Sequence, residues 1–297
     1  MGLNHKTKRL TVGLVLVCFL MLSGVCLSQG DTSVLPEDWK KSIALLLDGK
    51  NNKIGTGFFL ILEKGESTFI YLVTCYHVIA SHDTISIRLN AKEPKNGTLD
   101  FKVSINDTLY TRSHATQDVA LIRMRRDHLD PVKVDFRALP KEACAFAEER
   151  KKRNISEGDF VFFLGFPLGL SGIKRNLVIA RHGMIARMND EPLPIKGRRH
   201  PLDVFIIDGQ SFPGNSGSPL ILRREIRFPD KVSIPGSIPT VPRKVIGIMC
   251  DYLPYQDVAI SQRTKRPRVT FEENSGLSLA HPIDIVLEVE QMFFHEQ

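Results

Sequence analysis

Residues 213–220, PGNSGSPL, place Ser216 between two glycines in a segment of small residues. Glycine destabilises a strand or turn unless the backbone needs an unusual angle or a close approach. A surface turn would explain the segment, because Gly, Pro, Asn and Ser all favour turns. A nucleophile loop would explain it as well, since a serine that attacks a carbonyl needs backbone N–H groups aimed at the developing oxyanion, and Gly214 can turn its amide that way. Such a serine also needs a base and an orienting acid.

Two other segments offer the base and the acid. His77 follows an apolar, strand-like run in TFIYLVTCYHVIA (68–80), and Asp118 stands just before another apolar run in HATQDVALIRM (114–124). Alone, each residue is more often structural than catalytic. Together they give the chain order His, Asp, Ser, with gaps of 41 and 98 residues. A nucleophile, a base and an acid in any chain order can perform acyl transfer if the fold brings them together.

The motifs TCYHV, DVAL and GNSGSP resemble those of the chymotrypsin-fold serine peptidases, and most of all the bacterial-type branch that includes the HtrA (Do-type) proteases. Further segments are similar to that branch: GTGFFL (55–60), GDFVFFLGFPLGL (158–170), GMIARM (183–188), FIIDGQSFPGNSGSPL (205–220) and VIGI (245–248). Three motifs in order with matching flanks are far more specific than one alone. Two features differ from the branch: Ser218 stands where glycine is common, and we expect no PDZ domain after the peptidase segment.

The resemblance implies a role for each residue. His77 would take the proton from the Ser216 hydroxyl and pass it to the leaving amine, while Asp118 orients the ring. The backbone N–H groups of Gly214 and Ser216 would bind the oxyanion. Gln210, six residues before the nucleophile, resembles a pocket-floor position, and its neutral amide predicts cleavage after small or medium uncharged residues. Neither a metal nor a cofactor is expected, and the expected substrates are proteins or peptides.

Other functions remain open at this point. An inactive, peptide-binding pseudo-protease would use the same fold. An esterase or transferase would use the same triad, and comparing ester with peptide substrates separates it. A membrane-tethered structural protein is a further alternative, although it leaves the three ordered motifs unexplained.

The elements that must position these residues are short strands. Apolar or alternating runs separated by polar and Gly-containing segments fill residues 43–124 and resume at 160–222, 245–250 and 277–280. This pattern predicts an all-β chain with two barrels or sandwiches in tandem. The resemblance implies two six-stranded antiparallel β-barrels, at about 40–138 and 158–282, with His77 and Asp118 in the first and Ser216 in the second. A C-terminal α-helix is predicted at 282–295, after Pro282.

Three segments break the pattern of strands. Residues 140–158 are charged, with helical character near 141–153. Residues 223–243 and 251–276 are polar insertions too long for plain hairpin turns. We interpret the two insertions as substrate-facing or regulatory loops, or else as solvated decoration.

The N-terminal residues predict export. Lys6, Lys8 and Arg9 precede an apolar run at 10–27, which is the layout of a secretory signal peptide over residues 1–28. The peptidase domain would then be 29–297, secreted or periplasmic. An uncleaved N-terminal anchor is the alternative, and no later segment is long and apolar enough to span a membrane.

Composition sets further limits. The chain has 297 residues, 42% hydrophobic and 25% charged, which is ordinary for a globular protein. Its net charge of +7 includes three positive charges of the predicted signal peptide, so the remainder is only mildly basic and a nucleic-acid partner is not expected. After signal removal Cys75, Cys144 and Cys250 remain, and an odd set allows at most one disulfide within the chain.

Overall fold

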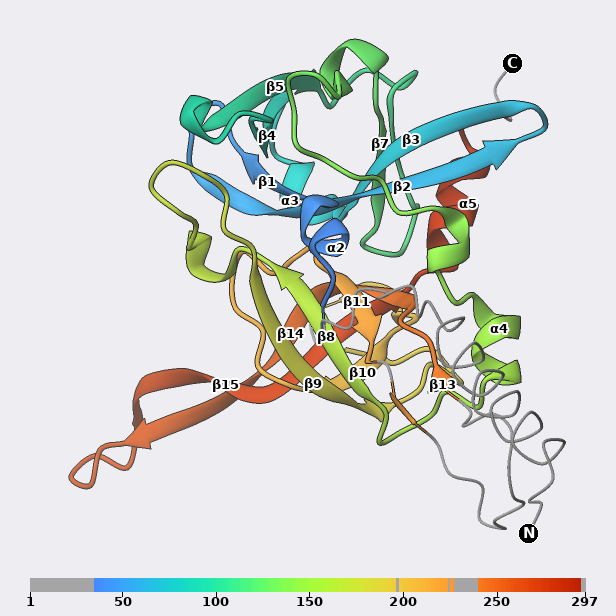
Figure 1. The fold of residues 1–297 in the computed structure, drawn as a ribbon. Coiled ribbons are helices and arrows are strands. Elements are labelled where there is room, and N and C mark those ends of the chain that lie inside the picture. The colour runs from blue at the N-terminus through green and yellow to red at the C-terminus, as the bar shows by residue number, and fades with distance from the viewer. Residues whose placement is uncertain (1–34, 196–197, 224, 227–239, 295–297) are drawn as a thin grey trace, which may run out of the picture. The chain divides into compact units, whose positions relative to one another are not determined.

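The structure is a computed structural model that describes residues 35–195, 198–223, 225–226 and 240–294. The predicted signal peptide and the greater part of the insertion 223–243 lie outside the described residues. From Glu37 onward the chain forms one compact unit built mainly of strands (Figure 1). Among the described residues, no helix is both long and apolar enough to cross a bilayer.

The first lobe is a seven-stranded antiparallel sheet in the order β5-β4-β1-β2-β3-β7-β6. The strands are β1 (Ile43–Leu47), β2 (Lys53–Lys64), β3 (Ser67–Thr74), β4 (Thr84–Asn90), β5 (Thr98–Ser104), β6 (Thr111–Ser113) and β7 (Ala120–Arg123). Two short α-helices and two 3₁₀ helices accompany them: α2 (Glu37–Lys41), α3 (Tyr76–Ile79), η1 (Pro94–Asn96) and η2 (Arg126–Leu129).

The second lobe is a closed six-stranded barrel in the order β10-β15-β14-β11-β8-β9. Its strands are β8 (Phe160–Gly165), β9 (Ile179–Arg187), β10 (Phe205–Asp208), β11 (Pro219–Leu222), β14 (Val245–Ile260) and β15 (Pro267–Pro282). The remaining elements are η3 (Lys141–Ala143), α4 (Ala147–Lys152), η4 (Pro167–Gly169), the small pair β12 (Glu225–Ile226) and β13 (Thr240–Val241), and α5 (Ile285–Gln291).

The apolar residues of the strands fill the interior of each lobe. Every residue of β1, sequence IALLL, is buried, as are Phe58, Phe59 and Leu60 in β2. In the second lobe Val161, Phe163 and other inward-facing side chains of several strands form one buried cluster. Burial of such apolar side chains contributes about 1.5–3 kcal/mol each, which fixes the register of the strands.

The predicted fold class, two chymotrypsin-like β-lobes and a C-terminal helix, is confirmed, with differences in detail. The first lobe has seven strands instead of six, and its two edge strands β5 and β6 are not paired in a ladder. A side-chain bond links these edges, since the Thr111 hydroxyl donates to the Ser104 carbonyl at 3.3 Å. Strand β6 was not predicted because its three residues, TRS, carry no apolar pattern.

The insertion 251–276 is the largest correction. Most of it belongs to two long strands: β14 and β15 continue past the barrel and pair with each other as far as Ile260 and Pro267 (Figure 1). Runs of β-branched and apolar residues such as VAI (258–260) and VTF (269–271) favour strands, and they outweigh the polar composition. Helix α5 is shorter than predicted, and α4 occupies part of the charged break.

Candidate active site

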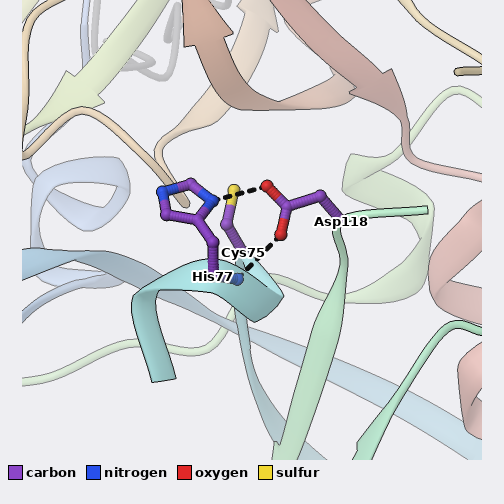
Figure 2. Close-up of side chains that lie close together, drawn as sticks. All are labelled: Cys75, His77 and Asp118. Carbon is purple, nitrogen blue, oxygen red and sulfur yellow. Dashed lines mark hydrogen bonds and ion pairs between the residues drawn. The ribbon is translucent and has the colours of Figure 1, made fainter. Parts of the chain in front are cut away.

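His77 and Asp118 form a hydrogen-bonded pair in the first lobe. The short helix α3 follows β3 directly and carries His77, while Asp118 stands just before β7, the neighbour of β3. The Asp118 carboxylate accepts twice from His77: its Oδ1 from the backbone amide at 2.8 Å, and its Oδ2 from Nδ1 at 2.5 Å (Figure 2). The Asp118 side chain is 10% exposed, so little water competes for these bonds. The pair leaves Nε2 of His77 as the nitrogen available to a reacting group.

The charge of Asp118 decides the pKa of His77. Burial is the largest single effect and lowers that pKa, but the hydrogen bond and the negative charge of Asp118 together outweigh it. Asp251 adds to the rise and Arg198 opposes it, and the net result is a raised pKa. The imidazolium that forms during proton transfer is therefore stabilised by the site.

A second histidine lies behind Asp118. His281 of β15 is completely buried, and its Nε2 accepts from the Asp118 backbone amide at 3.2 Å. Its Nδ1 lies 2.8 Å from the Asp203 carbonyl oxygen, which can only accept, so Nδ1 carries the proton. Burial is the main cause that lowers the pKa of His281. A neutral histidine of the second lobe thus holds the backbone of Asp118 in the first.

Ser216 and His77 face the same cavity, of about 180 Å³. The other residues of its wall are Ser211, Phe212, Pro213, Asn215, Met249, Cys250, Asp251 and Tyr252. The Ser216 hydroxyl donates to the Cys250 carbonyl at 3.2 Å. The three residues predicted as a triad are therefore gathered at one place, with the serine hydroxyl turned toward β14.

The two glycines beside Ser216 are required by the backbone. Gly214 has φ +97°, and a Cβ there would lie 2.3 Å from the Phe166 carbonyl oxygen. Gly217 has φ +87°, and a Cβ would lie 2.0 Å from the Thr56 carbonyl oxygen. The amides of Gly214 and Ser216 donate to no other described residue. Two unpaired N–H groups beside a serine are what an oxyanion hole requires.

Thr56 of β2 ties the nucleophile loop to the first lobe. Its amide donates to the Ser216 carbonyl at 3.0 Å, and its hydroxyl donates to the Gly214 carbonyl at 2.7 Å. The same hydroxyl accepts from the Phe166 amide at 3.2 Å, and the Thr56 carbonyl accepts from the Thr74 hydroxyl at 2.7 Å. Thr56 therefore fixes the carbonyls of Gly214 and Ser216, the two residues whose amides have no described acceptor.

Ser218, where the family commonly has glycine, fits because Gly165 lies opposite. The Ser218 side chain is fully buried, and a Cβ on Gly165 would come within 2.2 Å of its Oγ. Gly165 thus provides the space that the extra hydroxyl needs. This departure leaves the path of the loop intact.

Gln210 lies beside the cavity and is not among the residues of its wall. Its side chain is exposed, and its carbonyl accepts from Arg181 at 3.0 Å. The deeper wall contains Ser211, which is buried and whose amide donates to the Ser278 hydroxyl at 3.0 Å. Ser211, the residue after Gln210, therefore contributes a neutral hydroxyl group to the wall of the cavity.

An ion pair adjoins the cavity. Asp251 is part of the wall, and its carboxylate accepts from the Arg198 guanidinium at 2.5 Å. From the sequence, Asp251 at the start of the insertion 251–276 was a candidate to fold over the pocket and add negative charge, whereas Arg198, His281 and Thr56 were not singled out. The GTGFFL match pointed to the strand that carries Thr56, whereas no local sequence pattern marks His281 or Arg198.

Cys75 completes a group of possible metal ligands. Its Sγ, a nitrogen of His77 and an oxygen of Asp118 all lie within 4.8 Å of one another (Figure 2). Burial, aided by the charge of Asp118, raises the pKa of Cys75 well above its ordinary value, and the thiol donates to the Met249 carbonyl at 3.1 Å. The Cys75 thiol acts here as a buried hydrogen-bond donor behind the His77–Asp118 pair.

The family profile for the trypsin-like peptidase domain matches residues 55–227, which is more than half of the chain and includes His77, Asp118 and Ser216. The chain belongs to this family. Membership of the trypsin-like peptidases agrees with the two-lobed fold and implies a function of the serine-protease type, with proteins as substrates.

Two solved structures are similar to this trypsin-like peptidase, and the first of them supports its fold. The protease domain of MamO from Magnetospirillum magneticum, in its apo form, has 13% identity and a TM-score of 0.51, and the match covers 86% of this chain and 98% of that one. The atomic-resolution structure of HBP has 10% identity and a TM-score of 0.48, with 87% and 95% covered. A search of curated proteins gave no match.

Proposed function

We propose that this protein is a serine endopeptidase that hydrolyses peptide bonds through an acyl-enzyme. The observation that carries the proposal is the His77–Asp118 pair, bonded at 2.5 Å beside a serine whose loop offers two unpaired amides. His77 would take the Ser216 proton as the hydroxyl attacks the scissile carbonyl, and would return it to the leaving amine. The amides of Gly214 and Ser216 would stabilise the oxyanion, each by about 3 kcal/mol.

The first step requires a rotation of the serine side chain. The Ser216 hydroxyl donates to the Cys250 carbonyl, so it must turn to Nε2 of His77 before it can attack. Hydrogen bonds of catalytic groups are often formed only when substrate is bound. A substrate strand that lies along β14 and competes for backbone groups near Cys250 would favour this rotation.

For specificity we propose cleavage after small, uncharged residues. Ser211 and the Ser278 beneath it offer hydroxyl groups and no charge. The negative charge of Asp251 is paired with Arg198, which weakens its attraction for a basic side chain. Profiling of a proteome-derived peptide library tests this, and a dominant Arg or Lys before the cut site would contradict it.

We also propose export, as predicted from residues 1–28. A basic stretch followed by an apolar run is read by the secretion machinery, and a small residue ends it. N-terminal sequencing of the protein recovered outside the cytoplasm gives the cleavage point. Recovery of the uncut chain in the membrane fraction would favour the anchor instead.

The decisive experiment is labelling with a fluorophosphonate, which reacts covalently with an activated serine. The wild type should be labelled and should cleave peptides, and Ser216→Ala should lose both while keeping its melting temperature. Ser67→Ala removes an exposed serine of β3 and is the matched control. Equal labelling of wild type and Ser216→Ala would refute the proposal.

The pseudo-protease alternative also has an observation in its favour, the bond from the Ser216 hydroxyl to Cys250. If that bond persisted with substrate bound, the protein would bind peptides without cleaving them. This alternative would be favoured if calorimetry showed that the wild type binds a peptide without cleaving it and that Ser216→Ala binds the same peptide equally well. Hydrolysis of esters but not of peptides would favour the esterase.

A further inference from the structure

The outer part of the β14–β15 hairpin is an element that the proposed catalytic function does not use. Barrel pairing ends at Leu277, the last residue of β15 to pair with β10, and β11 pairs with β14 only at 245–248. From Pro254 to the turn the two strands pair only with each other, and they extend about 20 Å beyond the barrel (Figure 1). An isolated two-stranded ribbon is only marginally stable in water. The exposed part of this hairpin would therefore gain stability from a binding partner.

Apolar side chains are exposed on this ribbon. Tyr255, Val258, Ile260, Val269 and Phe271 are each 42–60% exposed. The register places Phe271 opposite Asp257 and Val269 opposite Ala259, so these two apolar residues share one face. Val258 and Ile260 alternate to the other face. Because the outer ribbon is apolar on both faces, it does not suit one-sided docking on a flat protein surface.

Charge is segregated along the same ribbon. The turn and its flanks carry four basic residues and no acidic one between 258 and 271: Arg263, Lys265, Arg266 and Arg268. None of the four forms an ion pair with a described residue. The acidic residues lie nearer the barrel, at Asp257, Glu272 and Glu273. The tip therefore presents unneutralised positive charge, and the base of the ribbon would repel an anionic surface.

The tip has a defined backbone. The Ser261 amide donates to the Arg266 carbonyl at 3.0 Å, and the Lys265 amide donates to the Ser261 carbonyl at 2.8 Å. Lys265 adopts φ +54°, which closes the turn. Pro254 and Pro267 lie in the paired strands, where proline hinders edge-to-edge pairing with another chain. A second copy of this protein is thus a poor partner for the ribbon edges.

We propose that the tip of the β14–β15 hairpin, residues 258–271, inserts end-on into the headgroup layer of an anionic lipid membrane. The four long basic side chains at the end contact the lipid phosphates, and the apolar residues directly behind them, Val258, Ile260, Val269 and Phe271, pack among the headgroups. Apolar residues on both faces suit immersion from the tip, and the inner acidic residues set the depth. Nucleic acid fits less well, because only one aromatic ring accompanies the basic residues.

Vesicle binding by the full chain tests this proposal. Flotation should show stronger partition to vesicles that contain phosphatidylserine than to phosphatidylcholine alone. Reversing the four basic residues (Arg263→Glu, Lys265→Glu, Arg266→Glu and Arg268→Glu) should lower partition to anionic vesicles by about 100-fold or more. The matched control reverses four exposed lysines away from the hairpin (Lys50→Glu, Lys92→Glu, Lys95→Glu and Lys174→Glu) and should lower it much less.

A local readout separates the tip from the N-terminal apolar run, which would bind any vesicle. Trp39 is the only tryptophan, so Phe271→Trp in a Trp39→Phe background reports the tip alone. Its emission should shift to the blue with anionic vesicles and stay unchanged with neutral ones. The proposal is overturned if the emission never shifts, if both quadruple variants lose binding equally, or if the tip binds oligonucleotides and not vesicles. A tip variant whose melting temperature falls is replaced by Arg263→Gln with Arg266→Gln, judged by the same shift.

Discussion

Two histidines contact Asp118, and their pKa values are shifted in opposite directions. The carboxylate bonds the ring of His77 and raises its pKa, whereas burial lowers the pKa of His281, which accepts from the Asp118 amide. One histidine is suited to gain a proton during a reaction and the other to remain neutral. The same aspartate is held through its side chain by one lobe and through its backbone by the other.

The raised pKa of His77 predicts the pH dependence of the proposed activity. A general base must be neutral, so kcat/KM should rise with pH through a midpoint above the ordinary histidine value of about 6.5. Asp118→Asn removes the charge and leaves burial, so the midpoint should fall, and kcat should drop about 10³–10⁴-fold. A pH–rate profile of both forms checks this. A midpoint that stayed in place without the carboxylate would contradict the assignment.

The free energy of unfolding should change with pH in the opposite sense. A raised folded-state pKa means that the pair stabilises the fold below the unfolded pKa of His77, and this contribution is lost as pH rises through the folded value. Activity is gained over the same interval. The site therefore gives up part of its stability on entering the pH range in which it works.

His281 should act as a positioning residue for Asp118. His281→Leu leaves the Asp118 amide and the Asp203 carbonyl without their partner, at a cost of about 1–3 kcal/mol for each buried group. The melting temperature and kcat should both fall, with KM changed little. His281→Gln keeps an acceptor and a donor and should recover part of kcat and the wild-type pH midpoint. Equal kcat and pH midpoint in the two variants would show that the ring only fills space.

At the scale of elements, strand β2 organises the nucleophile loop of the other lobe through Thr56. Thr56→Val keeps the shape but leaves the Gly214 carbonyl and the Phe166 amide without the hydroxyl. We expect a loss of about 2–4 kcal/mol in the free energy of unfolding and weaker fluorophosphonate labelling. Thr56→Ser keeps the hydroxyl and is the matched control. Full labelling of Thr56→Val would mean that the glycine conformations alone set the loop amides.

Elements with a strong local pattern were predictable from the sequence. The five-residue run IALLL and the segment FVFFLG, which lie in the ranges predicted to hold strands, became β1 and β8 because apolar burial dominates there. The GNSG segment was predictable as a special turn, because its φ values of +97° and +87° require glycine at both positions. Each of these features depends on its own residues and needs no distant partner.

Other features depend on partners far away in the chain. The buried His281 is bonded to Asp118, 163 residues earlier, and Arg198 reaches Asp251 across 53 residues. Gly165 makes room for Ser218 only after the two strands pair. The long ribbon of β14 and β15 was interpreted as loop because its charged residues hid a strand pattern that cross-strand pairing stabilises.

At the scale of the whole molecule, the described residues hold the loop that carries Ser216 without an ion pair to an N-terminus created by cleavage, which is how digestive members of this fold are activated. Asn215, directly before the nucleophile, is buried, and its Oδ1 accepts from the Phe212 amide at 3.1 Å. The loop is also held by Thr56, whose hydroxyl donates to the Gly214 carbonyl. We expect residues 29–297 to be active without internal cleavage. Active-site titration before and after limited proteolysis checks this, and a protein that stayed inert until a further N-terminal cut would contradict it.

The outer part of the β14–β15 ribbon can change in length and sequence independently of the barrel. Tyr255 and Glu273 are direct partners in the register, and everything beyond them contacts the barrel through no ladder. A two-residue turn joining these positions would satisfy hairpin geometry and leave the closed barrel with its six strands. Insertions, deletions and grafted sequences can therefore accumulate between 256 and 272 while Met249 to Tyr252 stay in place beside the serine. One pair of strands can thus carry part of the cavity wall at its base and a replaceable binding segment at its end.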